Sequence, residues 1–279
     1  MSALKRIVLP EIDPEVVQRE IEDFLIDRIV GAGLRGGVLG LSGGIDSATV
    51  AFVAALAFKR YNSENPAAPQ LKLIGLALPS DTNHPEHTSD AEEIGRILEI
   101  EVDVVPIQEH VDLLINRLGK IVEERHHRGN LASEMRAIVI SRYAAANHCM
   151  VLGTGNRDED YCLGYFTKRG DGAVDISPIG SLSKRLVRKL ASHMGVPEHI
   201  VHRVPTAGLW HGQTDEGELG FTYELAEIVI AGYDLGMDHD EIAAEAECSC
   251  EMVDRILSMH KRHEHKMSMP EIAPVTSLA

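Results

Sequence analysis

A short loop rich in glycine and hydroxyl groups is the first place where this chain could do chemistry. Residues 40–47 read Gly-Leu-Ser-Gly-Gly-Ile-Asp-Ser. The adjacent glycines allow an anion to approach the backbone closely, and the two serines add hydroxyl donors. An apolar run precedes the loop and a segment with helical spacing follows it, so backbone N–H groups at a helix start would face the same anion. The pattern predicts a phosphate-binding loop.

Two common nucleotide motifs do not fit this loop. A Walker motif needs Gly-Lys-Ser/Thr, which is absent here, and Gly40 and Gly43 lack the dinucleotide GxGxxG spacing. The pattern Ser-Gly-Gly-x-Asp-Ser instead resembles the pyrophosphate loop of the ATP pyrophosphatase superfamily, whose members cleave ATP between the α and β phosphates. The resemblance implies that the whole loop contacts ATP, namely Gly40, Leu41, Ser42, Gly43, Gly44, Ile45, Asp46 and Ser47.

A second dense motif lies in the latter half of the chain. Residues 153–184 read GTGNRDEDYCLGYFTKRGDGAVDISPIGSLSK, and residues 203–223 read RVPTAGLWHGQTDEGELGFTY. Together with the loop, they resemble the NAD synthetase family, in which ATP and ammonia convert the nicotinate carboxylate of deamido-NAD to the amide. The products are NAD, AMP and pyrophosphate. Glutamine-using relatives carry an added amidotransferase domain, so the resemblance implies a single domain over residues 1–279 and ammonia as the nitrogen donor.

The resemblance also implies roles for individual residues. Asp46 and Glu159 correspond to Mg²⁺ ligands, and oxygen donors suit this ion. Asp158 and Asp160 flank Glu159 and leave the register of the second ligand open. Further contacts with ATP phosphates or adenine are implied for Leu78, Thr154, Lys184 and Thr206. Contacts with deamido-NAD are implied for Arg136, Lys168, Asp175, His265 and Lys266.

Three of these residues are candidates for the chemistry itself. Lys184 would neutralise and orient the phosphates, and Asp46 would act on them through the Mg²⁺ that it holds. Asp175 could hold ammonium near the nicotinate and help to deprotonate it, since only neutral ammonia is a nucleophile. Competing interpretations remain for the lysines. Lys184 begins a predicted helix and could be a surface residue, and the pair His265 and Lys266 could simply complement the dipole at a helix end.

One predicted helix departs from the family pattern. The family commonly shows Gly-Asn-x-x-Ala-Arg-x-Arg, whereas residues 129–136 read Gly-Asn-Leu-Ala-Ser-Glu-Met-Arg. Glu134 replaces an arginine, so Arg136 is the surviving candidate for deamido-NAD, with Arg128 as the alternative. The adenine loop after Leu78 also diverges, and only backbone contacts near Leu78 are assigned there.

A glycine-rich segment, residues 205–220, is predicted to form a lid. It contains Trp210, the single tryptophan of the chain. Glycines permit motion, and an adenylated intermediate must be shielded from water until ammonia arrives. The alternative is a long surface loop in which Trp210 packs on its own neighbours.

The elements that position these residues alternate along the chain. A helix is expected from the Asp13 cap to Gly31. Strands and helices then follow at 37–41, 45–60, 71–78, 85–98, 101–107, 130–147 and 150–152. This order predicts an α/β fold: a Rossmann-like parallel sheet with helices on both faces, which the resemblance implies is adenine nucleotide alpha hydrolase-like. The loops after Leu41, Leu78 and Leu152 should therefore meet at one sheet edge.

The end of the chain is expected to be a helical C-terminal appendage. A helix is predicted over 184–194, and helices return from Thr222 onward with a break near residues 236–238. By resemblance, the protein forms a homodimer whose interface includes residues 130–147 and the C-terminal region.

Composition limits the partners. The chain has 279 residues, 44% of them hydrophobic, and a net charge of −16, which opposes attraction to nucleic acid or an anionic membrane. The longest apolar stretch, residues 50–58, is well short of the roughly 18 residues that a membrane span needs. The cysteines show no zinc spacing, and the cytoplasm is the expected location.

Two rival functions stay open: an ATP pyrophosphatase acting on another carboxylate or a tRNA base, and a non-catalytic nucleotide-binding regulator.

Overall fold

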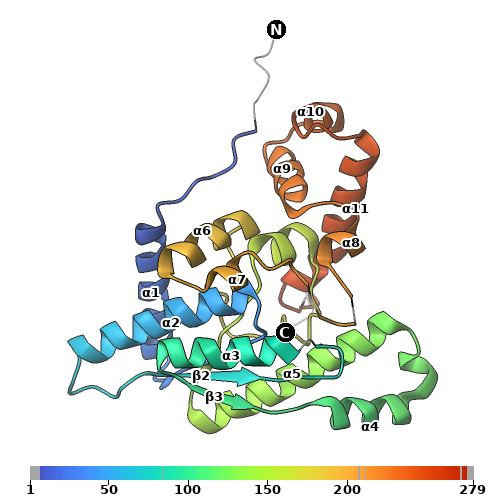
Figure 1. Cartoon of the computed structure of the whole chain (residues 1–279). Helices are drawn as coiled ribbons and strands as arrows, with labels where there is room; N and C mark the ends of the chain where they lie inside the picture. The colour runs from blue at the N-terminus through green and yellow to red at the C-terminus, as the bar shows by residue number, and fades with distance from the viewer. Residues whose placement is uncertain (1–6, 84, 207, 211, 271, 275–279) are drawn as a thin grey trace, which may run out of the picture.

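The computed structural model describes residues 7–83, 85–206, 208–210, 212–270 and 272–274 (Figure 1). Its sheet is parallel and has the order β3-β2-β1-β4. The strands are β1 (Gly36–Gly40), β2 (Lys72–Ala77), β3 (Glu101–Val104) and β4 (Met150–Val151). The chain leads from β1 toward β3 on one side and places β4 on the other. Ligands bind beyond the carboxyl ends of strands at such a reversal.

Helices cover both faces of this sheet, which confirms the predicted α/β class. One face carries α1 (Pro14–Gly31), α2 (Ile45–Glu64), α3 (Pro85–Leu98) and α6 (Lys184–Met194). The other carries α4 (Gln108–Leu118) and α5 (Arg125–Asn147). Successive residues of β1 face opposite sides, since Leu39 joins the first core and Val38 the second. In the described part of the chain, no helix has both the length and the apolarity that a bilayer crossing requires.

The helix boundaries follow local signals in most places. The Asp13 side chain accepts the Glu15 N–H at 3.0 Å and caps α1 as predicted. α3 and α6 have the predicted bounds. α5 begins five residues before the predicted start at Asn130, so Gly129 lies inside the helix. That glycine serves packing, because a Cβ atom there would lie 2.7 Å from Cβ of Leu209.

Other predicted segments also differ from the structure, and α2 ends at Glu64 and not at the predicted residue 60. The third strand ends at Val104 and not at residue 107, because Pro106 cannot donate a ladder hydrogen bond. The predicted loop 205–220 contains a short helix, α8 (Asp215–Leu219), whose cap is Thr214 accepting the Gly217 N–H. The sequence predicted Gly217 to be a loop residue. In the structure it lies in α8, and its N–H donates to the Thr214 side chain at the start of that helix.

The C-terminal helices form a separate cluster beyond the sheet (Figure 1). They are α9 (Tyr223–Asp234), α10 (His239–Glu245) and α11 (Cys250–Met267). The predicted break near residues 236–238 is confirmed, and a second break follows α10, where Ser249 caps α11. This cluster packs on a π-helix, η2 (Asp158–Leu163), and so supports a loop that follows β4. The remaining elements are η1 (Gly119–Val122) and α7 (Glu198–Val201).

The close pairing of β1 with β2 predicts a severe effect for Gly36→Ala. Gly36 has φ +140, and a Cβ atom there would lie 1.8 Å from the carbonyl oxygen of Lys72. The backbone of β1 or β2 must therefore shift in Gly36→Ala. We expect the free energy of unfolding of this variant, measured by urea titration, to fall by about 3 kcal/mol. Gly31→Ala is the control, because open space surrounds that position. Equal stability of the two variants would contradict this account of the sheet.

Candidate active site

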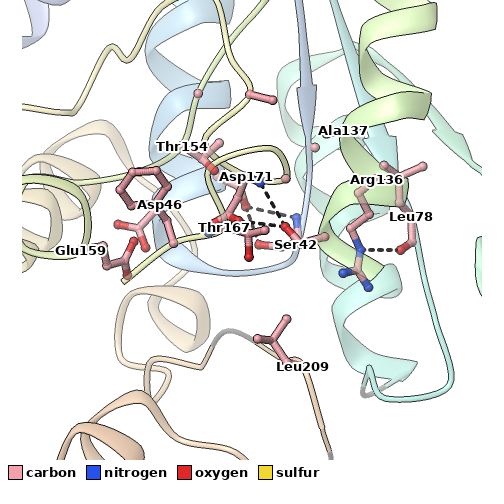
Figure 2. Close-up of a pocket in the computed structure, with 18 of the residues that line it drawn as sticks. Ser42, Asp46, Leu78, Arg136, Ala137, Thr154, Glu159, Thr167, Asp171 and Leu209 are labelled. Atoms are coloured by element: carbon pink, nitrogen blue, oxygen red, sulfur yellow. Dashed lines mark hydrogen bonds between the residues drawn. The ribbon is translucent and has the colours of Figure 1, made fainter. Parts of the chain in front are cut away.

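The loops after β1, β2 and β4 line one cavity of about 390 Å³, as predicted from the strand order. They contribute Leu41 and Ser42, Leu78 and Pro79, and Gly153 and Thr154, respectively. Thr206, Leu209 and Trp210 and the end of α11 complete the wall, the last through Lys266. Figure 2 shows several of these side chains around the space. The segments that the sequence singled out for chemistry therefore meet at one place.

The glycine loop is ordered by its own hydroxyl groups. The Ser42 and Ser47 Oγ atoms lie 3.1 Å apart, and the Ser42 N–H donates to Ser47 Oγ at 3.2 Å. Ser47 Oγ in turn donates to the Gly44 carbonyl at 3.0 Å. Gly43 has φ +74, and a Cβ atom there would lie 2.8 Å from the His87 backbone. Glycine is therefore required where the loop passes the start of α3.

A buried ion pair network lies beside this loop. The Lys184 ammonium contacts the Asp46 carboxylate at 2.6 Å and the Glu159 carboxylate at 2.7 Å. The three residues come from α2, η2 and α6, and we call them the lysine–carboxylate centre. Lys184 is 1% exposed, which excludes the interpretation that it is a surface residue. Figure 2 shows Asp46 and Glu159 side by side.

Burial and charge act in opposite directions on this centre. Burial by itself would lower the pKa of Lys184, but the Asp46 and Glu159 carboxylates outweigh it and raise that pKa, so the ammonium form persists. Burial raises the pKa of Glu159, with a further contribution from the negative charge of Asp46. Two carboxylates sharing one ammonium leave a net negative charge at the centre when both are ionised. That charge favours a second cation.

The donor set fits Mg²⁺. Lys184 Nζ marks a point that oxygens of both Asp46 and Glu159 reach at once, and Asp46 Oδ1 also accepts from the Asn156 side chain at 3.2 Å. Carboxylate oxygens from two loops are ligands that a hard divalent cation prefers. The residues present are therefore compatible with the ion that the sequence resemblance implies.

The structure separates the three neighbouring acids of η2. Glu159 reaches Lys184, whereas Asp158 accepts the backbone N–H of Lys184 at 2.8 Å and so caps the start of α6. Asp160 lies against Gly155, where a Cβ atom would be 2.2 Å from its Oδ2. Burial raises the pKa of Asp158 to about 6 and that of Asp160 to about 7. Geometry thus selects Glu159 as the partner of Asp46 in the lysine–carboxylate centre.

The residues expected to contact deamido-NAD fall into two groups. Lys266 lines the cavity and donates to the Gly164 and Phe166 carbonyls, both at 2.8 Å. Lys168 is not among the cavity-lining residues; its ammonium donates to the carbonyls of His265 and Ser268. Asp175 is exposed, and its carboxylate accepts the Val151 N–H at 2.7 Å. His265 is exposed as well. The roles of these four residues stay predictions.

Arg136 lines the cavity and faces the loop that follows β2. Its Nε donates to the Leu78 carbonyl at 3.1 Å, as Figure 2 shows, and its Nη2 donates to Ser80 and Asn83 at 3.0 Å each. Burial lowers the pKa of Arg136 to about 10. The alternative, Arg128, is exposed and donates to the Val122 carbonyl at 3.1 Å. Arg136 thus orders the predicted adenine loop.

Sequence reasoning missed several polar residues in and beside the cavity. Ser133 Oγ lies 2.8 Å from Asp171 Oδ1 and accepts the Asp171 N–H at 3.0 Å. A Cβ atom at Gly170 would lie 2.2 Å from Ser133 Oγ, so the small serine leaves room for the turn at Gly170. The Tyr223 hydroxyl lies 3.3 Å from Glu159 Oε1 and 3.0 Å from Asp215 Oδ2. The glycines on either side of Asp171 in GYFTKRGDG were the available signal for it.

Part of segment 205–214 lines the cavity, through Thr206, Leu209 and Trp210. The Gly208 carbonyl accepts from Thr82 Oγ1 at 3.0 Å. The Arg125 guanidinium lies 4.2 Å from the centre of the Trp210 ring, so Trp210 packs on α5 and not only on its own neighbours. Ala207 and His211 of the predicted lid lie outside the described residues.

Comparisons with known proteins agree with this geometry. A family model described as NAD synthase matches residues 17–270. The NH(3)-dependent NAD(+) synthetase of Hyperthermus butylicus is 36% identical over 263 residues, which cover 94% of this chain and 91% of that protein. Its counterpart from Thermococcus kodakarensis is 39% identical over 251 residues, covering 90% and 93%.

Solved structures give the same result. An NMN synthetase from Francisella tularensis matches with a TM-score of 0.81 and 31% identity, covering 95% of this chain and all of that one. The NAD+ synthetase from Burkholderia pseudomallei matches with a TM-score of 0.71 and 27% identity, covering 95% and 93%. The fold, the cavity at the strand ends and these matches lead to one conclusion: the chain belongs to the NAD synthase family.

Proposed function

We propose that this protein is an ammonia-dependent NAD synthetase, a carbon–nitrogen ligase that uses ATP to adenylate the nicotinate carboxylate of deamido-NAD. Ammonia then attacks the adenylate, giving NAD and AMP after the earlier release of pyrophosphate. The observation that carries the proposal is the meeting of Asp46, Glu159 and Lys184 beside the glycine loop. The relatives named as NH(3)-dependent synthetases support it.

The chemistry explains why such a centre is needed. A carboxylate is a poor acyl donor because its leaving group would be oxide, whereas an adenylate has a phosphate leaving group. The loop at residues 42–47 would bind the departing pyrophosphate, with Thr154 and Thr206 as further hydroxyl donors. Asp46 and Glu159 would hold Mg²⁺, which when bound supplies a compact positive charge to the phosphates. Lys184 adds a second cation at the same place.

The remaining part of the cavity would hold deamido-NAD. Lys266 provides a cation there, and Arg136 holds the loop against which the nucleotide would lie. Three residues that the resemblance assigns to deamido-NAD lie outside the cavity lining: Lys168, Asp175 and His265. In a homodimer, each copy of the chain would bring these residues to the substrate bound by the other copy. Exposed apolar side chains support a homodimer: Leu113, Ile121 and Ile138 are 55%, 71% and 55% exposed on or beside α4 and α5. We place the enzyme in the cytoplasm, consistent with four free cysteines.

A second candidate is the same amidation on nicotinate mononucleotide, which would give NMN. The match to the Francisella NMN synthetase, at 31% identity and over 95% of this chain, favours it. Glu134 also lies where the family pattern has an arginine, so one expected phosphate contact of a dinucleotide is missing. Both candidates use the same adenylation chemistry.

Turnover should identify the reaction directly. With ATP, Mg²⁺, ammonium and deamido-NAD, we expect NAD, AMP and pyrophosphate in equal amounts by chromatography. A parallel reaction with nicotinate mononucleotide tests the second candidate through the ratio of kcat/KM for the two substrates. Formation of ADP, or no turnover with either acid, would contradict the proposal and favour a different ATP pyrophosphatase or a regulator.

Loss of the shared ammonium should disable the centre. In Lys184→Met, Asp46 and Glu159 face each other without a cation, so we expect kcat to fall about 10²- to 10³-fold. Mg²⁺ should raise the melting temperature of this variant more than that of the unmodified protein. Lys189→Met is the control, because Lys189 is exposed and pairs with Glu11. Near-normal kcat in Lys184→Met would remove the lysine from the mechanism.

Trp210 offers a direct test of the lid, since it is the single fluorophore of its kind. Binding of both nucleotides should shift its emission and protect residues 205–214 from limited proteolysis. Arg125→Ala should alter the emission before ligands are added, because the guanidinium lies over the ring. Emission and cleavage that are identical with and without ligands would argue for a static loop.

A further inference from the structure

An arginine far along the chain holds the backbone of the phosphate loop from outside the cavity. Arg203 Nη1 donates to the Gly43 carbonyl at 2.8 Å, and the same nitrogen pairs with the Asp90 carboxylate of α3. The Asp90 side chain is 9% exposed and also lies 3.2 Å from His199 Nε2. Arg203 therefore joins three segments: the loop after β1, α3, and the stretch that leads into residues 205–214. Arg203 is absent from the cavity lining.

The contact matters because of the peptide unit that it holds. Gly43 and Gly44 are adjacent, and neither carries a Cβ atom, so the peptide between them can rotate at low cost. After such a rotation, the Gly43 carbonyl would exchange sides with the Gly44 N–H. A carbonyl oxygen that faces a phosphate repels it, whereas an N–H attracts it.

The structure holds this peptide at both ends. Arg203 binds the Gly43 oxygen on one side, and Ser42 Oγ accepts the Gly44 N–H at 3.3 Å on the other. Ser42 lines the cavity and Arg203 does not, so the N–H end of the peptide is held from the cavity side and the oxygen end from the other side. The hydrogen bond from a charged donor is the stronger of the two restraints.

We propose that Arg203 is a positioning residue for the phosphate loop. Held by Asp90, it keeps the Gly43 carbonyl turned away from the anion, so that the N–H groups of the loop face the leaving pyrophosphate of ATP. The inference rests on the proposed function, since it takes pyrophosphate as the occupant of the loop. It adds a residue that touches no substrate and acts through the backbone.

Calorimetric titration with inorganic pyrophosphate and Mg²⁺, together with steady-state kinetics, tests this role. In Arg203→Ala we expect pyrophosphate affinity to fall, and the KM for ATP to rise, by about ten-fold or more, the loss typical of a hydrogen bond from a charged group. The KM for ammonium should change by less than about two-fold, because the loop serves ATP alone. Arg203→Lys should recover part of the affinity, since an ammonium can donate to one carbonyl.

Arg60→Ala is a matched control. Arg60 is 21% exposed and pairs with Glu22, whose side chain is 6% exposed; Arg203 is 22% exposed and pairs with a similarly buried acid. Both substitutions take a guanidinium from a buried carboxylate that keeps a second basic partner, Arg19 for Glu22 and His199 for Asp90. Arg60, however, lies near the end of α2, away from the loop. We expect Arg60→Ala to lower the melting temperature without changing pyrophosphate affinity.

A double variant separates positioning from charge pairing. Arg203→Ala with Asp90→Asn also removes the charge of the carboxylate that Arg203 paired with, yet the Gly43 carbonyl stays unheld, so pyrophosphate affinity should stay low. Recovery of normal affinity in the double variant, or normal affinity in Arg203→Ala, would overturn the positioning role and leave the proposed function standing. If the unmodified protein bound neither pyrophosphate nor ATP, the proposed function would fail, and this inference with it.

Discussion

The sharing of one buried ammonium by two carboxylates is the constraint on which the rest of the site depends. Lys184 is almost fully buried, and a buried charge without partners is costly, so Asp46 and Glu159 must both reach it. This requirement fixes the start of α2, the π-helix η2 and the start of α6 relative to one another. It also leaves the glycine loop directly beside a cluster of charge. The contacts of Lys184 with Asp46 and Glu159 therefore hold the fold together at the same place where the chemistry is proposed to occur.

The surrounding elements act as supports for that contact. Asp158 caps α6 through the Lys184 N–H, and the Tyr223 hydroxyl of α9 reaches Glu159. The C-terminal helices pack on η2 and therefore stabilise the cavity wall from behind. Removing charge from the centre is for this reason expected to affect stability as well as turnover.

Much of the frame was predictable from local patterns in the sequence. The Asp13 cap, the glycine turn before α2 and the bounds of α3 and α6 all depend on short-range signals, and the structure confirms them. The long-range contacts were not predictable. Nothing in the spacing shows that Arg203 reaches Gly43, or that Ser133 makes room for Gly170, since such pairs are set by packing. Arg136 carried the expected charge, but only the structure shows that it holds the loop at Leu78.

The claim that Asp46 and Glu159 act as one cation site is tested most directly by a double-mutant cycle. Binding of Mn²⁺, a spectroscopic substitute for Mg²⁺, would be measured by electron paramagnetic resonance in the presence of ATP for Asp46→Asn, Glu159→Gln and the double variant. If both carboxylates hold one ion, each single change should weaken Mn²⁺ strongly and the second change should add little. A Mn²⁺ ion that stays bound in each single variant and is lost only in the double variant would show two independent sites and contradict the account.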